Sequence, residues 1–361
     1  MSKILFSGKF TELFELTPLF AYKIHYFCHL KSTFSMKLIK YSVLSLALWT
    51  LSCHNHNKET KNWDIELKQP LPPVELVDIS QSFYDAHTPL PEFQKEYPWF
   101  QGSVSDEDYA KRRLDTREIE IYKTAKKQLN EIQLKKDLAT LFAHIQYYFP
   151  KFVAPKVFLY SSAVQGVEIP VFYKLEENWL FIDIAAFIGK GNRYYQGVDL
   201  YLQESMNPEN LIPTVSRALA EHIVPLDRTH RKFIDDIAYE GKLMMLQDAF
   251  LPNTSDALKI GYSPEQEAWA KANEANIWNY FVENDLLFSD DARLIERFLA
   301  PAPFSKFYTE IDNESAPRAG VFIGWQICRA YFKQLPDTSL AEFILKTKGE
   351  DILKQSKYKG E

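Results

Sequence analysis

The sequence predicts an α+β fold, one mainly helical domain wrapped around a small antiparallel or mixed sheet. Short apolar runs with strand-like composition gather between residues 157 and 202, whereas the segments on either side show the helical spacing of apolar residues. No internal repeat and no low-complexity tract divides the chain. We therefore expect residues 74–361 to form a single globular domain.

The first part of this domain is expected to be helical after a short strand at 74–79. An aromatic segment broken by prolines, residues 83–100, should pack on the domain without regular structure. Ser105 and Asp108 form a capping signature that opens a helix running to about residue 115, and a second helix should cover 117–129. A third has an apolar stripe from Leu134 to Phe149 and ends at Pro150. His144 lies beside this stripe and is interpreted as a core residue, not a ligand.

The middle of the chain predicts the sheet. Apolar runs at 157–160, 167–173 and 179–184 are expected to be strands, the last two joined as a hairpin by the turn at 176–178. A fourth strand is expected at 197–202. Helices then resume at residue 211, and the basic tail from 346 to 359 is expected to be a disordered end.

A lipoprotein signal is the clearest feature near the N-terminus. Lys37 and Lys40 precede an apolar run, 41–51, that is too short to span a bilayer and ends at Ser52 and Cys53. Residues 36–52 are therefore predicted to be a signal peptide, Cys53 the lipidated first residue and 53–73 a tether. A signal of this kind leads its chain, so residues 1–35 are interpreted as an upstream extension from a gene start placed too early. The alternative for residues 1–35 is a weak amphipathic leader, and the alternative to the lipoprotein signal is a chance cysteine behind an apolar stretch.

Charge and cysteine content narrow the class of protein. Residues 1–52 hold six Lys and two Glu, so residues 53–361 carry 36 basic and 46 acidic side chains, a net charge of −10. This balance argues against a nucleic-acid partner, which would require clustered basic residues. If Cys53 is acylated, Cys328 has no disulfide partner and is expected to be a small buried residue.

Two helical segments resemble a zinc-peptidase site from which parts are missing. In the H-E-x-x-H pattern, two histidines one turn apart bind zinc, the glutamate activates water, and a later helix supplies a third ligand. Here Ala218 and Leu219 replace the first histidine and the glutamate, while His222 and Glu240 occupy the other two ligand positions. We therefore expect no metal, no cofactor and no catalysis at this site. His222 and Glu240 are predicted either to contact each other or to lie on separate surfaces.

Several segments together resemble the GldB family of gliding-motility lipoproteins of Bacteroidota, over the chain from Cys53 to about Lys346. They are Leu51–Cys53, Tyr97–Phe100, Arg217–His222, Ala238–Lys242 and Pro317–Ile327. The resemblance implies a zincin-like domain with a degenerate site, anchored in a membrane of the cell envelope on the periplasmic side. It also implies partners among other gliding or secretion proteins, with a scaffold role.

The segment from Pro317 to Ile327 has two interpretations. Gly320 and Gly324 lie one helical turn apart and would let another backbone approach, which favours core packing. The resemblance to peptidases instead implies a binding groove formed by Arg318, Gly320, Gly324 and Trp325. Two alternatives to a scaffold remain open: an active zinc metallopeptidase with unusual ligands, and a protein that binds a soluble ligand.

Overall fold

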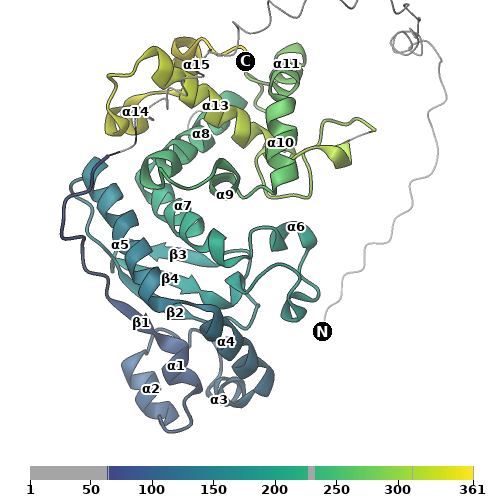
Figure 1. Ribbon diagram of the computed structural model, residues 1–361. Helices are drawn as coiled ribbons and strands as arrows, with labels where there is room; N and C mark the ends of the chain where they lie inside the picture. Colours follow the sequence, from purple (N-terminus) through teal and green to yellow (C-terminus); the bar gives the residue numbers. More distant parts are fainter. Residues whose placement is uncertain (1–62, 64, 227–231, 311, 361) are drawn as a thin grey trace, which may run out of the picture. The chain divides into compact units, whose positions relative to one another are not determined.

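The structure, a computed structural model, describes residue 63 and residues 65–226, 232–310 and 312–360 (Figure 1). The predicted upstream extension, the signal peptide and Cys53 lie outside the described residues. Within the described ranges no helix has both the length and the apolar character needed to cross a membrane.

A four-stranded mixed sheet lies at the centre of the described domain. Its order is β1-β2-β4-β3; β2 is parallel to both neighbours, and β3 is antiparallel to β4 as the predicted hairpin requires. The strands are β1 (Leu76–Asp78), β2 (Lys156–Tyr160), β3 (Val171–Lys174) and β4 (Trp179–Asp183). The α+β class and the mixed sheet are therefore confirmed.

The fourth predicted strand, at 197–202, is wrong. The chain there bends at Gly197, whose φ is 94°, and forms the single helical turn α6 (Leu200–Gln203). The buried Gln203 amide donates to the carbonyl of Val198 at 2.8 Å and to that of Tyr195 at 3.3 Å. These two bonds hold the turn, and a local apolar pattern does not reveal them.

Each face of the sheet has its own hydrophobic core, because side chains alternate along a strand. Phe158 and Phe181 face a smaller aromatic core, which also receives Phe83, Phe93 and Tyr109. That core is built by three short helices, drawn below the sheet in Figure 1: α1 (Ile79–Tyr84), α2 (Leu90–Glu96) and α3 (Asp106–Leu114). The predicted lack of regular structure at 83–100 is thus wrong in part.

The prolines of this segment explain the error. Pro91 stands in the first turn of α2, where a missing N–H costs no hydrogen bond, so it starts the helix and does not break it. The predicted Ser105 cap is confirmed, since its hydroxyl accepts from the Asp108 amide at 3.1 Å.

The larger core fills the opposite side of the sheet. It is enclosed by α4 (Thr116–Gln128), α5 (Glu131–Tyr148), α7 (Leu211–Ile223), α8 (Phe233–Phe250) and α13 (Ala319–Gln334). His144 is buried in it and lies 2.9 Å from the Thr140 carbonyl through Nδ1, as expected for a core histidine. Trp63, in the predicted tether, already contacts this body, with its ring 4.8 Å from that of Phe332.

Shorter helices complete the C-terminal half. They are α9 (Asp256–Ile260), α10 (Pro264–Ala272), α11 (Glu274–Glu283), α12 (Arg293–Phe298), α14 (Leu340–Lys346) and α15 (Gly349–Ser356). Single 3-10 turns occur at Ile184–Phe187, Arg193–Tyr195, Pro208–Asn210 and Asp312–Glu314.

The predicted disordered tail is wrong. Helix α15 packs against α8 and α13, with Ile352 fully buried. Just beyond it, the Tyr358 hydroxyl donates to Glu274 at 2.8 Å. The lysines of this segment are all exposed, and only Lys354 lies within α15, so its basic composition does not distinguish this amphipathic helix from a disordered end.

Candidate functional site

The predicted peptidase-like positions lie on α7 and α8, which pack directly against each other. Ala218 and Leu219 are both buried in the larger core, with 9% and 2% of their surface exposed. Their side chains carry no donor atom, so the half of the ligand pattern that they occupy contributes packing only.

His222 points away from this core. It is exposed at the end of α7, and its ring meets that of Tyr173 on β3 edge-on, with centroids 5.1 Å apart at 85°. No hydrogen bond or ion pair joins His222 to Glu240 among the described residues. The structure gives Glu240 different partners.

Arg217, one residue before the predicted motif, pairs with Glu240. Its Nη2 donates to Glu240 Oε1 at 3.0 Å, and its Nη1 lies 2.9 Å from Oε2. The second contact lacks hydrogen-bond geometry, so it is an ion pair and not a directed bond. Arg217 Nε donates to Glu221 at 2.8 Å, which adds a second carboxylate at the surface end of the pair.

Arg318 is a third member of this cluster. It precedes α13 with a left-handed backbone, φ 53°, which turns its side chain inward. Its Nη1 donates to the Ile260 carbonyl at 2.9 Å, and its Nη2 lies 3.8 Å from Glu240 Oε2. Arg217, Arg318, Glu221 and Glu240 therefore form a charge-balanced cluster that joins α7, α8 and α13.

The electrostatics of the cluster favour the charged forms of the central pair. Burial raises the pKa of the Glu240 carboxyl, but the charge of Arg217 and its hydrogen bond outweigh burial, and the pKa is lowered overall. Burial likewise opposes the charge of Arg217, and Glu240 more than compensates, so the pKa of Arg217 is raised. The pKa of Arg318 is lowered by burial and by the nearby Arg217 charge.

The glycines of the predicted groove are points of close helix packing. A Cβ on Gly324 would stand 3.0 Å from the Ile237 side chain, and one on Gly241 would stand 2.6 Å from the Gly324 carbonyl carbon. Gly320 faces Phe298 and Leu299 in the same way. These contacts fit the core-packing interpretation, in which α8 and α13 approach backbone to backbone.

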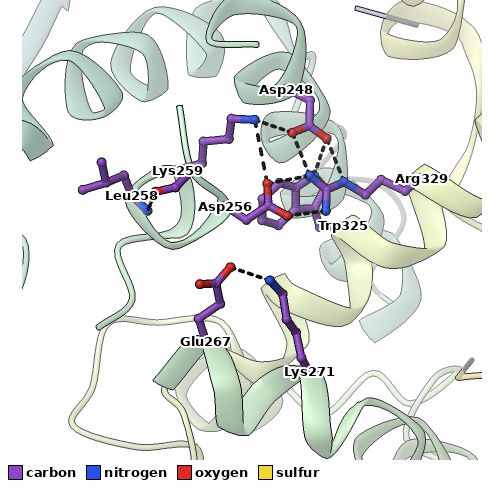
Figure 2. A network of polar contacts seen from close by, with 9 residues as sticks. Asp248, Asp256, Leu258, Lys259, Glu267, Lys271, Trp325 and Arg329 are labelled. Atoms are coloured by element: carbon purple, nitrogen blue, oxygen red, sulfur yellow. Dashed lines mark hydrogen bonds and ion pairs between the residues drawn. The ribbon is translucent and has the colours of Figure 1, made fainter. Parts of the chain in front are cut away.

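Trp325 belongs to a buried polar network that the sequence did not reveal (Figure 2). Its indole Nε1 donates to Asp248 at 2.9 Å, and Arg329 stacks over the indole ring, 3.8 Å from its centroid. Asp248 and Asp256 each accept two hydrogen bonds from Arg329. Lys259, whose side chain is fully buried, donates to Asp248 at 2.8 Å.

This network links α8, α9 and α13, and its two cations balance its two anions. The sequence shows that Trp325 and Arg329 lie one helical turn apart. It does not show their partners, because Asp248 and Asp256 lie about 70 to 80 residues away from Arg329. Within the described ranges no three His, Cys, Asp or Glu side chains converge in a way that could hold a metal ion.

Cys328 is free and fully buried on α13, as the sequence predicted. Burial raises the pKa of its thiol to about 12, which keeps it protonated.

Fold and site together define the class of protein, an α+β domain. Two of its helices, α7 and α8, carry half of a zinc-ligand pattern, and the ion pair of Arg217 and Glu240 lies where these helices meet. The family described as "Gliding motility protein GldB" matches residues 58–360, so the chain belongs to this family, and the resemblance seen in the sequence is confirmed. No curated protein and no solved structure matches the chain significantly.

Proposed function

We propose that this protein is a lipid-anchored, non-catalytic component of the gliding motility and associated secretion machinery of the cell envelope. In this proposal Cys53 carries the anchor on the periplasmic side, and the domain holds another envelope protein. Membership of the GldB family supports the motility role, and the sequence around Cys53 supports the anchor.

The Arg217–Glu240 ion pair is the observation that carries the non-catalytic part of the proposal. A metal ion at Glu240 would have to displace Arg217, leaving its guanidinium with only the half-exposed Glu221 as counter-ion. Arg217 thus supplies the positive charge that a zinc ion would supply to this carboxylate in a peptidase. Ala218 and Leu219 offer neither a ligand nor a general base beside it.

Metal analysis of the purified protein tests this part directly. We expect less than one zinc ion per ten chains after dialysis, and no peptide hydrolysis with zinc added. Near-stoichiometric zinc that a chelator removes together with a hydrolytic activity would overturn the proposal in favour of an unusual metallopeptidase.

Substitutions in the cell test the anchor and the scaffold role. Cys53→Ala should release the protein from membranes and abolish gliding, since a single acylated cysteine is the proposed attachment. His222→Ala should leave gliding intact, because in this proposal His222 binds no metal and it lies outside the ion-pair cluster. Loss of gliding in His222→Ala, with the protein present at its normal level, would favour catalysis.

A further inference from the structure

Two adjoining cavities lie at the carboxyl end of β2, the strand with a parallel neighbour on each side. In open α/β sheets ligands bind outside the carboxyl ends of parallel strands, and β1, β2 and β4 of this mixed sheet are parallel in the same way. The large cavity, about 510 Å³, lies between the start of α4, residues 163–168 and residues 194–202. The small cavity, about 250 Å³, lies between α1, α3 and residues 160–166. Gln165 lines both cavities.

Polar groups without protein partners line the small cavity. Burial raises the pKa of Tyr160. Its hydroxyl makes no hydrogen bond within the described part of the chain. The hydroxyl of Tyr109, a residue only 3% exposed, is buried and has no partner. A buried hydroxyl without a partner costs about 1–3 kcal/mol, so the Tyr109 hydroxyl indicates a ligand that completes it. The Tyr160 hydroxyl is only partly buried and adds a second polar group that such a ligand can reach.

Arg112 adds hydrogen-bond donors to the same cavity. Its Nε lies 3.0 and 3.3 Å from the two oxygens of Glu118, which also accepts from the Tyr84 hydroxyl at 3.1 Å. The two terminal nitrogens of Arg112 make no hydrogen bond among the residues that the structure describes. The ion pair balances the charge, so what the cavity offers is directed hydrogen bonding and not net charge.

Aromatic rings form the remaining walls of the small cavity, from Phe83, Tyr84 and Phe100. Such rings present flat apolar faces with partial negative charge, which attract the C–H faces of a ligand. A ligand that fits this cavity therefore combines an apolar face with several neutral polar groups.

The large cavity offers both donors and acceptors. It is lined by the guanidinium of Arg117, by the amides of Gln165 and Gln196, and by four carboxylates, those of Asp115, Glu118, Glu168 and Asp199. Two of these carboxylates are already engaged, since Asp115 caps α4 and Glu118 pairs with Arg112. No ion pair neutralises Arg117, Glu168 or Asp199 in the described ranges. An anion would meet these carboxylates, and an apolar ligand would leave the donors and acceptors unpaired.

The loop that separates the two cavities is held in an unusual backbone conformation. Ala163 and Val164 both have positive φ, 55° and 69°, and both line the large cavity. A β-branched residue in this region is an outlier that costs about 1–3 kcal/mol, and such residues concentrate at functional sites. The buried Asp183 fixes the loop by accepting from the Ser162 amide at 3.1 Å and from its hydroxyl.

We propose that these two cavities bind a neutral carbohydrate of two or more sugar units. Aromatic faces in one cavity and mixed donors and acceptors in both match the apolar faces and the hydroxyl groups of linked sugar rings. The large cavity lies within the range of about 300–1,000 Å³ that is usual for ligand sites. This inference goes beyond the proposed function and does not depend on it.

A glycan array carrying neutral, anionic and cationic saccharides tests the proposal. The full chain is purified in a detergent without a sugar headgroup, labelled and applied to the array, and dissociation constants of retained saccharides are then measured by calorimetry. We expect retention of neutral disaccharides or longer chains. The variant Tyr160→Phe, which removes one hydroxyl and keeps the ring, should weaken their binding about tenfold, as should Glu168→Gln in the large cavity.

Tyr147→Phe is the matched control, because Tyr147 is 57% exposed on α5 and lines neither cavity. It should bind saccharide as the unaltered protein does, and thermal unfolding should be unchanged in all three variants. The proposal is overturned if no saccharide is retained, if only charged saccharides are retained, or if neither cavity variant weakens binding.

Discussion

Arg217 on α7 and Glu240 on α8 form a buried ion pair with two contacts, 2.9 and 3.0 Å, at the place where a zinc-ligand pattern is half present. Only 23% of the Arg217 side chain and 15% of the Glu240 side chain are exposed. Each charge is therefore satisfied chiefly by the other, and the stability of the domain depends on both.

Glu240→Gln should lower the free energy of unfolding by about 3 kcal/mol, because it leaves Arg217 and Arg318 buried without their shared counter-ion. Urea unfolding followed by circular dichroism measures this change. Glu221→Gln is the matched control: Glu221 also pairs with Arg217, but its side chain is 48% exposed, and its loss should cost about 0.5 kcal/mol or less. Equal effects of the two variants would contradict a dominant buried pair.

The same pair predicts a dependence of stability on pH. The pKa of Glu240 is lower in the folded protein than in the unfolded chain, where it is about 4.3. The contribution of the Glu240 carboxylate to the free energy of unfolding is therefore present above the unfolded pKa. It is lost as the pH falls through the lower pKa of the folded protein. We expect the stability difference between the unaltered protein and Glu240→Gln to shrink below about pH 4 in urea titrations. A difference that stays constant down to pH 2 would contradict this assignment.

Gly324→Ala should destabilise the domain by about 2–3 kcal/mol, because the new methyl group meets the Ile237 carbonyl on α8 and cannot be relieved by a rotamer change. Thermal unfolding measures the loss. Gly166→Ala is a suitable comparison, since its Cβ would lie 3.8 Å from Ser162, an ordinary contact, and it should change stability by less than about 0.5 kcal/mol. A tolerated Gly324→Ala would mean that α8 and α13 can separate.

Local patterns predicted the elements of this fold well where one segment carries the whole signal. The Ser105 cap, the apolar stripe of α5 and the hairpin of β3 and β4 depend on residues a few positions apart. The GldB motifs, including the one around Glu240, likewise identified the family.

Prediction failed where the outcome depends on distant partners. Helix α15 depends on burial of Ile352 against α8 and α13. Helix α6 is a different case, because the bonds of the Gln203 amide are local, to Val198 and Tyr195, and an apolar pattern carries no sign of them. At the site, the positions of Ala218, Leu219 and Glu240 could be interpreted from a motif. The pairing of Glu240 with Arg217 could not, because α7 and α8 are separated in sequence and only their packing sets which side chains meet.

Asp248→Asn should lower the free energy of unfolding by about 3 kcal/mol, because it removes the nearer counter-ion of the fully buried Lys259 and leaves only Asp256, 3.9 Å away. Glu267→Gln, in the nearby exposed pair with Lys271 shown in Figure 2, is the matched control and should cost about 0.5 kcal/mol or less. Adding Lys259→Met to Asp248→Asn should recover part of the loss, because the uncompensated charge is then gone. If the double variant is no more stable than Asp248→Asn, the loss of stability comes instead from the hydrogen bonds that Asp248 accepts from Trp325 and Arg329.

Asp183 should titrate far above an ordinary aspartate. Burial raises the pKa of its carboxyl to about 6, and the hydrogen bonds from Ser162 and from the Ala185 amide lower it without cancelling that effect. A raised folded pKa means that Asp183 contributes stability below its unfolded value of about 3.9 and that this contribution is lost as the pH rises toward 6. Asp183 therefore acts in the opposite direction to Glu240. Carbon-detected NMR of the carboxyl should show a midpoint near pH 6, and in Asp183→Asn the decline of stability between about pH 4 and 6 should be reduced. A midpoint below pH 4 would show that the hydrogen bonds from Ser162 affect the pKa of Asp183 more than burial does. The loop would then be held by the charged carboxylate.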